Sequence, residues 1–334
     1  MAKETQNRHT PSNPFQVLDK LGLGEDQDKV LAAEASAFTK ALDGKHPRTI
    51  AVVNYKGGVG KTTATFFLGA QVAHQEPKKK VLIIDIDAQC SLTTVFGQDP
   101  IAGNDQNILV LLKGGKAISP ASIKKDAFVK KGKYGTGIPA NLFLLSGAFE
   151  VEDLDYELAQ DKTMSKEDFF KQCRRVLALF HDFDYIFVDC PPNKMFLTQG
   201  MLRACNYYVV VAIPDKVSTY GIPRLLNWVE QIPIDSRPKL VGALINRVIR
   251  TGKGITDEQE RWLVAIQNTV SKRALLTKNR GVLGLWPNSN NVCKVYGSGK
   301  SHLGTPDIWE SGSRQAAVGD CVAESAAHLI SVCK

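Results

Sequence analysis

The sequence predicts a doubly wound α/β domain, in which a mostly parallel sheet carries helices on both faces. After Arg48, short apolar runs alternate with stretches of helical periodicity, which is the order of elements that builds such a sheet. Several runs are β-branched and nearly continuous, as in strands that are covered on both faces. A glycine-rich segment also joins the first run to a helical pattern. The expected strands are Thr49–Asn54, Val81–Asp85, Leu142–Leu145, Tyr185–Asp189, Tyr208–Ile213 and Leu240–Asn246.

Length and composition are those of a globular protein of enzyme size. The 334 residues are 43% apolar and 23% charged, which argues against disorder, a collagen repeat or a disulfide scaffold. The seven cysteines are scattered and form no C-x-x-C pair, so we expect reduced thiols and neither a zinc site nor a thioredoxin-like site. The start has no apolar leader core, and the longest nearly apolar run, Tyr207–Pro214, is far shorter than the ~20 residues that cross a bilayer. We therefore expect a cytoplasmic protein.

Three parts are expected along the chain. Residues 1–14 are polar and contain two prolines, which predicts a flexible tail. Residues 15–47 are predicted to form a helical arm, and the remaining residues, 48–334, the main domain. The lysine- and glycine-rich stretch 113–137 is expected to be a surface excursion of that domain. The simpler interpretation packs the arm on its own domain, and a role in dimerisation is the alternative. The apolar residues that recur at helical spacing in the arm are Leu31, Ala35, Phe38 and Leu42.

The segment from Asn54 to Thr63 has the pattern of a phosphate-binding loop. It joins the first expected strand to a helix predicted over Thr62–Gln71, where backbone N–H groups and the positive end of the helix dipole point at an anion. Glycines allow the backbone to approach a phosphate, Lys61 can neutralise the β and γ phosphates, and the Thr62 hydroxyl can ligate magnesium. A glycine turn with incidental lysines is the weaker alternative, given the G-K-T-T ending. The residues expected to contact the nucleotide here are Lys56, Gly57, Gly58, Val59, Gly60, Lys61, Thr62 and Thr63.

This loop carries a second lysine. Tyr55 stands where such loops usually begin with glycine, and Lys56 follows it. The resulting K-G-G-V-G-K-T-T resembles the deviant Walker A loop of the ParA/MinD family of P-loop ATPases. In that family the early lysine, here Lys56, reaches across a nucleotide-sandwich dimer to the phosphates of the partner subunit. The resemblance implies an ATP hydrolase of the P-loop fold, with ATP and Mg²⁺ as cofactors and a homodimer in the ATP state.

Acids that end two of the expected strands match further motifs of the family. Residues 85–89, D-I-D-A-Q, resemble its D-x-D-P-Q motif with alanine in place of proline, which implies that Asp87 orients the attacking water and that Asp85 supports magnesium or the loop. Residues 185–192, Y-I-F-V-D-C-P-P, resemble its Walker B segment, which implies that Asp189 holds magnesium through a water. We interpret Cys190 as a small buried residue and not as a nucleophile. The implied catalytic residues are Lys56, Lys61 and Asp87, and the implied metal-binding residues are Thr62, Asp85 and Asp189.

Two later segments resemble the family's base-binding strands. They are V-A-I-P, ending at Pro214, and G-A-L-I-N-R, ending at Arg247. The match implies that Asn246 bonds the adenine edge, that Arg247 packs on the ring and that Pro214 borders the base. A turn residue at the end of a strand is the other interpretation of Asn246. The resemblance runs from about Arg48 to Arg250, so residues 1–47 lie outside it and are too short for the helix-turn-helix extension of some plasmid ParA proteins.

Charge and the C-terminal segment separate the two main branches of the family. MinD-like members bind membranes through a basic C-terminal amphipathic helix. Ala316–Val332 has no Lys or Arg, with Lys334 the only cation near it, and is predicted to be a helix that docks on the domain. From Arg261 to Pro306 the chain has seven cations and no acid, which favours a polyanion. A solvated surface explains each of these side chains individually as well as a DNA contact does. The candidate DNA contacts are Arg250, Lys272, Arg273, Lys278 and Arg280.

The resemblance to the ParA branch implies a complete cycle. ATP drives a dimer that binds double-stranded DNA nonspecifically, and hydrolysis stimulated by a ParB-like partner releases it, which partitions a plasmid or chromosome or positions a cargo. Such a protein is nucleoid-associated in the cytoplasm and does not bind a membrane. The alternative is a MinD-like regulator that acts at a membrane or on a protein partner without DNA. Iron–sulfur relatives and carriers of tail-anchored proteins are disfavoured because the cysteines lack the required surroundings.

Overall fold

The computed structural model describes residues 46–96, 98–100, 106–113, 129–131, 139–160, 165–251, 254–288 and 316–334. Its central element is an eight-stranded sheet in the order β10-β7-β6-β1-β5-β2-β4-β3. All neighbours pair in parallel except β3, which is antiparallel to β4 at one edge. The strands are β1 Arg48–Val53, β2 Val81–Asp85, β3 Val129–Lys131, β4 Leu142–Leu145, β5 Tyr185–Asp189, β6 Tyr207–Ala212, β7 Lys239–Val248 and β10 Val282–Pro287. A separate hairpin joins β8 Arg250–Thr251 to β9 Gly254–Ile255.

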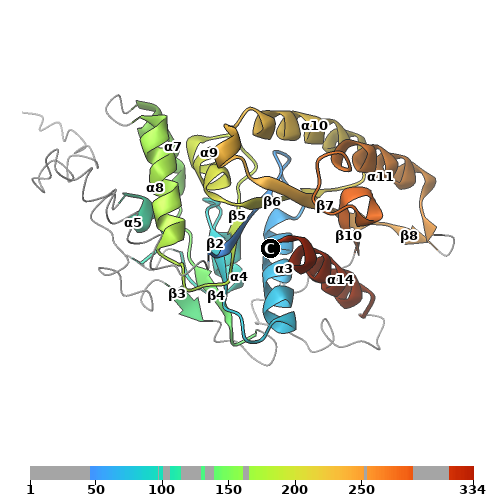
Figure 1. Cartoon of the computed structure of the whole chain (residues 1–334), viewed down its shortest axis with the longest axis horizontal. Helices are drawn as coiled ribbons and strands as arrows, with labels where there is room; N and C mark the ends of the chain where they lie inside the picture. Colours follow the sequence, from blue (N-terminus) through green and yellow to red (C-terminus); the bar gives the residue numbers. More distant parts are fainter. Residues whose placement is uncertain are drawn as a thin grey trace, which may run out of the picture.

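Helices cover both faces of this sheet. Figure 1 shows α3 and α14 on one side and α9, α10 and α11 on the other. The helices are α3 Lys61–Gln75, α4 Ser91–Val95, α5 Ile108–Lys113, α7 Val151–Gln160, α8 Lys166–Ala178, α9 Phe196–Ala204, α10 Lys216–Glu230, α11 Asp257–Val270 and α14 Ala316–Val332. Two 3₁₀ turns, η3 Ile234–Ser236 and η4 Lys278–Gly281, complete the described elements. Among the described helices, none combines the length and hydrophobicity that crossing a bilayer requires.

Alternation along the strands builds two separate cores. In β1, Ile50 and Val52 face the core with α3 and α14, whereas Ala51 and Val53 face the core with α8 to α11. All four side chains are buried, because a central parallel strand has helices above and below it. Continuous apolar runs were predicted for this reason, and the doubly wound α/β fold class is confirmed.

The predicted elements agree closely with the observed ones. Three strands, β2, β4 and β5, have the predicted bounds, and β1, β6 and β7 differ by one or two residues at their ends. The C-terminal helix docks as predicted: α14 packs on α3 and β10, and the Trp286 indole N–H donates to Ser325 Oγ at 3.0 Å. Sequence reasoning missed β10, because its six residues lie inside a stretch that was interpreted by charge alone.

Some predictions fall on parts of the chain that the structure does not describe. The tail 1–14 and the arm 15–47, apart from His46 and Pro47, lie outside the described residues. Of the excursion 113–137, the structure describes Lys113 at the end of α5 and the edge strand β3. The placement of these three segments therefore stays a prediction.

Two helical glycines give a stability test of this packing. A Cβ on Gly69 of α3 would lie 2.8 Å from Ile83 Cγ2 of β2, so Gly69→Ala should overpack the core and destabilise the protein by about 1–3 kcal/mol. Gly221 of α10 has no heavy atom within 4 Å of its Cβ position. Gly221→Ala is the matched control and should stabilise by up to about 1 kcal/mol through helix propensity. Urea unfolding measures the change in the free energy of unfolding for both variants. Equal changes in Gly69→Ala and Gly221→Ala would contradict the close contact between α3 and the sheet.

Candidate nucleotide-binding site

The loop between β1 and α3 is held by Asn54, the residue that follows β1. Its buried Nδ2 donates to the Val211 carbonyl of β6 at 2.7 Å, and its Oδ1 accepts the Lys56 N–H at 2.9 Å. Asn54 therefore ties the start of the loop to the neighbouring strand and sets the direction in which the chain leaves the sheet.

Glycine is required at Gly60 for two reasons. Its φ of 93° lies in the left-handed region, and a Cβ there would lie 2.2 Å from the Asn246 Nδ2 atom at the end of β7. Gly60 is also the N-cap of α3, and among the described residues no side-chain capping hydrogen bond forms at this end of the helix. The loop thus presents unpaired donors and the positive end of a helix dipole, which is a site for an anion.

Lys61 opens α3 and lies inside this loop. Only 6% of the residue is exposed, and its ammonium donates to the Lys56 carbonyl at 3.3 Å. Burial lowers the pKa of this lysine, and the nearby carboxylates Asp189 and Asp87 partly oppose that shift. A partly desolvated ammonium beside free helix N–H groups suits a phosphate, whose charge would replace the lost water.

Two buried carboxylates lie beside the loop because β2 and β5 pair in parallel. Asp85 and Asp189 are register partners, and both are at most 1% exposed. Asp85 accepts two bonds from Thr93, both at 2.8 Å, whereas Asp189 accepts one from Thr65 Oγ1 at 3.1 Å. Burial raises the pKa of each carboxyl, and the Asp85 charge raises that of Asp189 further. The second oxygen of Asp189, Oδ2, is buried without a hydrogen-bond partner among the described residues.

The other acid of the motif, Asp87, lies nearer the surface. It is half-buried, and its Oδ1 accepts the Gln89 N–H at 3.0 Å. Cys190 is buried as predicted, and burial raises the pKa of its thiol well above the ordinary value. Such a thiol is inert as a nucleophile.

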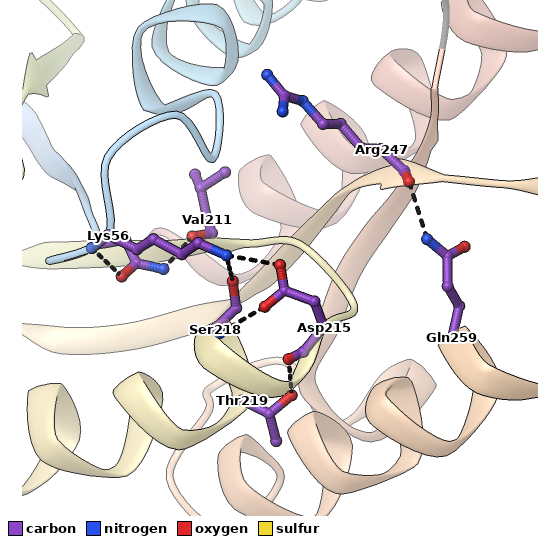
Figure 2. Close-up of polar contacts among 8 residues, drawn as sticks. Lys56, Val211, Asp215, Ser218, Thr219, Arg247 and Gln259 are labelled. Atoms are coloured by element: carbon purple, nitrogen blue, oxygen red, sulfur yellow. Dashed lines mark hydrogen bonds and ion pairs between the residues drawn. The ribbon is translucent and has the colours of Figure 1, made fainter.

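Lys56 extends away from the loop toward α10. Its ammonium lies 2.6 Å from Asp215 Oδ2 and 3.5 Å from Ser218 Oγ (Figure 2). Asp215 is also the N-cap of α10, because its Oδ1 accepts the Ser218 N–H at 2.7 Å. The two lysines of the loop therefore have different surroundings: Lys61 is buried in the loop, and Lys56 forms a half-exposed ion pair with another element of the same chain.

The predicted base-binding residues lie at the carboxyl ends of β6 and β7. Asn246 Nδ2 donates to the Val59 carbonyl of the loop at 2.9 Å, and its Oδ1 accepts the Arg247 N–H at 2.9 Å. Arg247 has a φ of 56°, and its carbonyl accepts a bond from Gln259 of α11 (Figure 2). Pro214 is buried beside them. Asn246 thus supports the loop here, which the sequence did not indicate.

Several contacts of the site were missed by sequence reasoning. Asn54, Thr65 and Thr93 carry no motif that marks them. Asp215 and Ser218, in contrast, have the spacing of a helix N-cap, so the start of α10 could have been found in the sequence. The contact between Asp215 and Lys56 could not have been found in this way, because these two residues are 159 positions apart.

Four of the five candidate DNA contacts follow α11 in the chain, and Arg250 precedes it. Lys272, Lys278 and Arg280 are exposed. Arg273 pairs with Glu230 of α10 and also contacts Asn227, so its charge is compensated within the chain. Arg250 lies in β8, where the side chain is not described. Four of the five candidates are thus exposed, and one of these four, Arg273, is held in an ion pair with Glu230.

A parallel sheet, a strand–loop–helix anion site and acids at the adjacent strand ends define a P-loop ATPase, and the second lysine is that of the deviant Walker A type. A family profile described as "AAA domain" matches residues 47–241. A ParA family protein of Chlamydia muridarum is 33% identical over 237 residues, which are 70% of this chain and 83% of that protein. The chain belongs to the ParA/MinD family and is an ATP hydrolase.

Other relatives agree with this assignment. The sporulation initiation inhibitor protein Soj of Bacillus subtilis is 30% identical over 211 residues, 62% of this chain and 76% of its own length. An ATP complex of Cyanothece McdA superposes with a TM-score of 0.64 at 20% identity, covering 86% of this chain and 98% of McdA. MinD in the MinC:MinD complex of Aquifex aeolicus gives 0.58 at 19% identity, covering 85% and 96%. At these identities the solved structures support the fold.

The buried carboxyl Asp189 makes stability depend on pH. Because its pKa is raised in the folded chain, the folded state binds more protons than the unfolded state above the ordinary pKa, and stability falls as pH rises through that window. In the nucleotide-free protein, Asp189→Asn should remove this loss and raise the free energy of unfolding at pH 8 by about 1–3 kcal/mol. Urea unfolding at pH 5 and pH 8 measures the free energy of unfolding of the variant and of wild type. Asp87→Asn is the control, and a less stable Asp189→Asn at pH 8 would contradict the assignment.

Proposed function

We propose that the chain forms an ATP-dependent sandwich dimer that binds double-stranded DNA nonspecifically, and that hydrolysis stimulated by a ParB-like partner releases it. Such a cycle partitions a plasmid or chromosome or positions a cargo at the nucleoid. The observation that carries the proposal is the second lysine. Lys61 already occupies the phosphate loop, and Lys56 points out of it with its side chain 31% exposed.

In the proposed site, the loop residues Gly57 to Thr63 hold the phosphates of ATP. Backbone N–H groups and Lys61 supply the positive charge, and Asn246, with Arg247 and Pro214 beside it, borders the base. Asn246 already donates a hydrogen bond to the Val59 carbonyl of the loop. Binding of the base at Asn246 would therefore affect the loop that holds the phosphates.

The acids and Thr62 fit a magnesium ion. The unpartnered Asp189 Oδ2 atom is buried between Asp85 and the loop, and a cation would stabilise the ionised form that burial disfavours. The described residues contain no cluster of three or more metal ligands. Mg²⁺ takes one or two protein ligands and completes its shell with phosphates and water. Bound there, the ion would neutralise charge on the phosphates. Thr62 and Asp189 would hold it, Asp85 would support them, and Asp87 would orient the attacking water.

Lys56 must leave Asp215 to reach a partner subunit. The ion pair is about one-third exposed on both sides, and such pairs contribute about 0–1 kcal/mol. A phosphate in a water-poor interface attracts an ammonium several times more strongly than it does in bulk water. The exchange of Asp215 for a nucleotide across the dimer is therefore favourable, and the nucleotide becomes a bridge between subunits.

DNA is favoured over a membrane as the surface on which the dimer acts. On the part of α14 whose side chains are described, Val322 and Leu329 are buried at 0% exposure against the domain and are not available to lipid. Lys272, Lys278 and Arg280 offer exposed cations for phosphates. A putative plasmid partition protein of Borrelia burgdorferi has the same fold, with a TM-score of 0.58 at 18% identity.

Separate roles for the two lysines can be measured. Lys61→Ala should abolish ATP binding, because it removes the only ammonium inside the loop as described. Lys56→Ala should bind ATP within about threefold of wild type but lose ATP-dependent dimerisation, since the cost falls on the interface. Nucleotide titration and light scattering measure the two properties. Wild-type dimerisation by Lys56→Ala would overturn the proposed role in the partner's site.

DNA binding is tested with a salt series on a duplex of arbitrary sequence, with ATP, ADP and no nucleotide. Wild type should bind with ATP at low salt, and affinity should fall steeply as salt rises. Lys278→Glu with Arg280→Glu should weaken binding at least tenfold and leave hydrolysis unchanged, whereas Arg273→Gln, whose charge is compensated, should change it about twofold or less. No binding at low salt with ATP, together with binding to anionic vesicles, would favour the MinD-like alternative.

A further inference from the structure

Tyr55 is the residue of the loop that the proposed cycle does not use. It stands where phosphate loops usually have glycine, and its ring lies 6.1 Å from the ring of Trp228 in α10. The Lys194 ammonium lies 4.4 Å from the Tyr55 ring centroid and 6.0 Å from that of Trp228. The Tyr55 hydroxyl is buried with no hydrogen-bond partner in the described part of the chain. The contacts of Tyr55 are therefore those of its ring, and we call these three residues the ring cluster.

Tyr55 and Lys56 contact opposite ends of one helix. Lys56 reaches Asp215 at the N-cap of α10, and Tyr55 reaches Trp228 in its last turn. These two contacts are thirteen residues apart, or about 20 Å along a helix. Neighbouring residues of the loop thus brace α10 at both ends, and a displaced Tyr55 would shift the backbone from which Lys56 extends.

Lys194 connects a third segment of the chain, the one between β5 and α9, to Tyr55 and Trp228. It lies between Asp189, at the end of β5, and the start of α9, and it is exposed. Its charge over the two rings connects the segment after the Walker B acid to the start of the phosphate loop. An ammonium over an aromatic face at an exposed site contributes enough to change a local opening equilibrium about two- to fivefold.

We propose that Lys194 is a positioning residue for Lys56: through the ring cluster it holds the start of the loop in the geometry from which Lys56 enters the partner's nucleotide site. The inference rests on the proposed function for the destination of Lys56. The contacts of Lys194 with Tyr55 and of Lys56 with Asp215 do not depend on the proposed function, because both are present in a single chain without nucleotide.

Two measurements on the full chain test this inference. The first is the rate of hydrogen exchange of the Lys56 backbone amide in the absence of nucleotide. This amide donates a hydrogen bond to Asn54 Oδ1, which protects it from exchange. The second is the ATP concentration that gives half-maximal dimerisation. Lys194→Met keeps the aliphatic stem and removes the charge, and it should raise both quantities about two- to fivefold. Lys194→Arg should restore wild-type values, and Tyr55→Phe, which keeps the ring, should match wild type.

The matched control is Lys166→Met. The Lys166 ammonium lies 4.9 Å from the Phe196 ring centroid, the same kind of contact between α8 and α9, away from the loop. It should change neither measurement.

Failure of the inference and failure of the proposed function are distinguishable. If Lys194→Met leaves exchange of the Lys56 amide unchanged, or if Lys194→Arg does not restore it, the positioning role is wrong. If wild type does not dimerise with ATP, the proposed function fails, and the exchange measurement still decides the role of Lys194.

Discussion

The parallel pairing of β5 with β1 on one side and with β2 on the other is the constraint on which the site depends. It places Asp189 opposite Val52 and also opposite Asp85, so a buried carboxyl pair lies beside the chain segment that leaves β1. A parallel sheet aligns the carboxyl ends of its strands at one edge, so a phosphate loop and metal-binding acids meet there without any long-range loop.

This edge combines charges that are costly to bury. Lys61 and the two carboxyls have pKa values shifted by burial toward their neutral forms. Bound ATP with magnesium would supply the opposite charges: phosphates for the lysine and a cation for the acids. Without nucleotide, these buried groups lack partners of opposite charge. This is one physical reason for such a site to select a ligand that carries both anionic phosphates and a bound cation.

Helix α10 connects this chemistry to the surface. Its first turn receives Lys56, and its last turn packs Trp228 against Tyr55. The same helix supplies Glu230, which compensates Arg273 after α11. One element therefore contacts the nucleotide loop at two points and also contacts one of the candidate DNA-contacting residues.

By itself, the sequence determined the class of fold, the phosphate loop and the acids of the two motifs. These depend on local periodicity and on residues close together in the chain, such as the four apolar residues that end β1 before the loop and the carboxyls that end β2 and β5. Only the tertiary structure decided that Lys56 pairs with Asp215, that Asn246 supports Val59 and that Lys194 covers Tyr55. Those contacts join residues more than a hundred positions apart, and they follow from which strands become neighbours and how side chains pack between them, which local patterns do not encode.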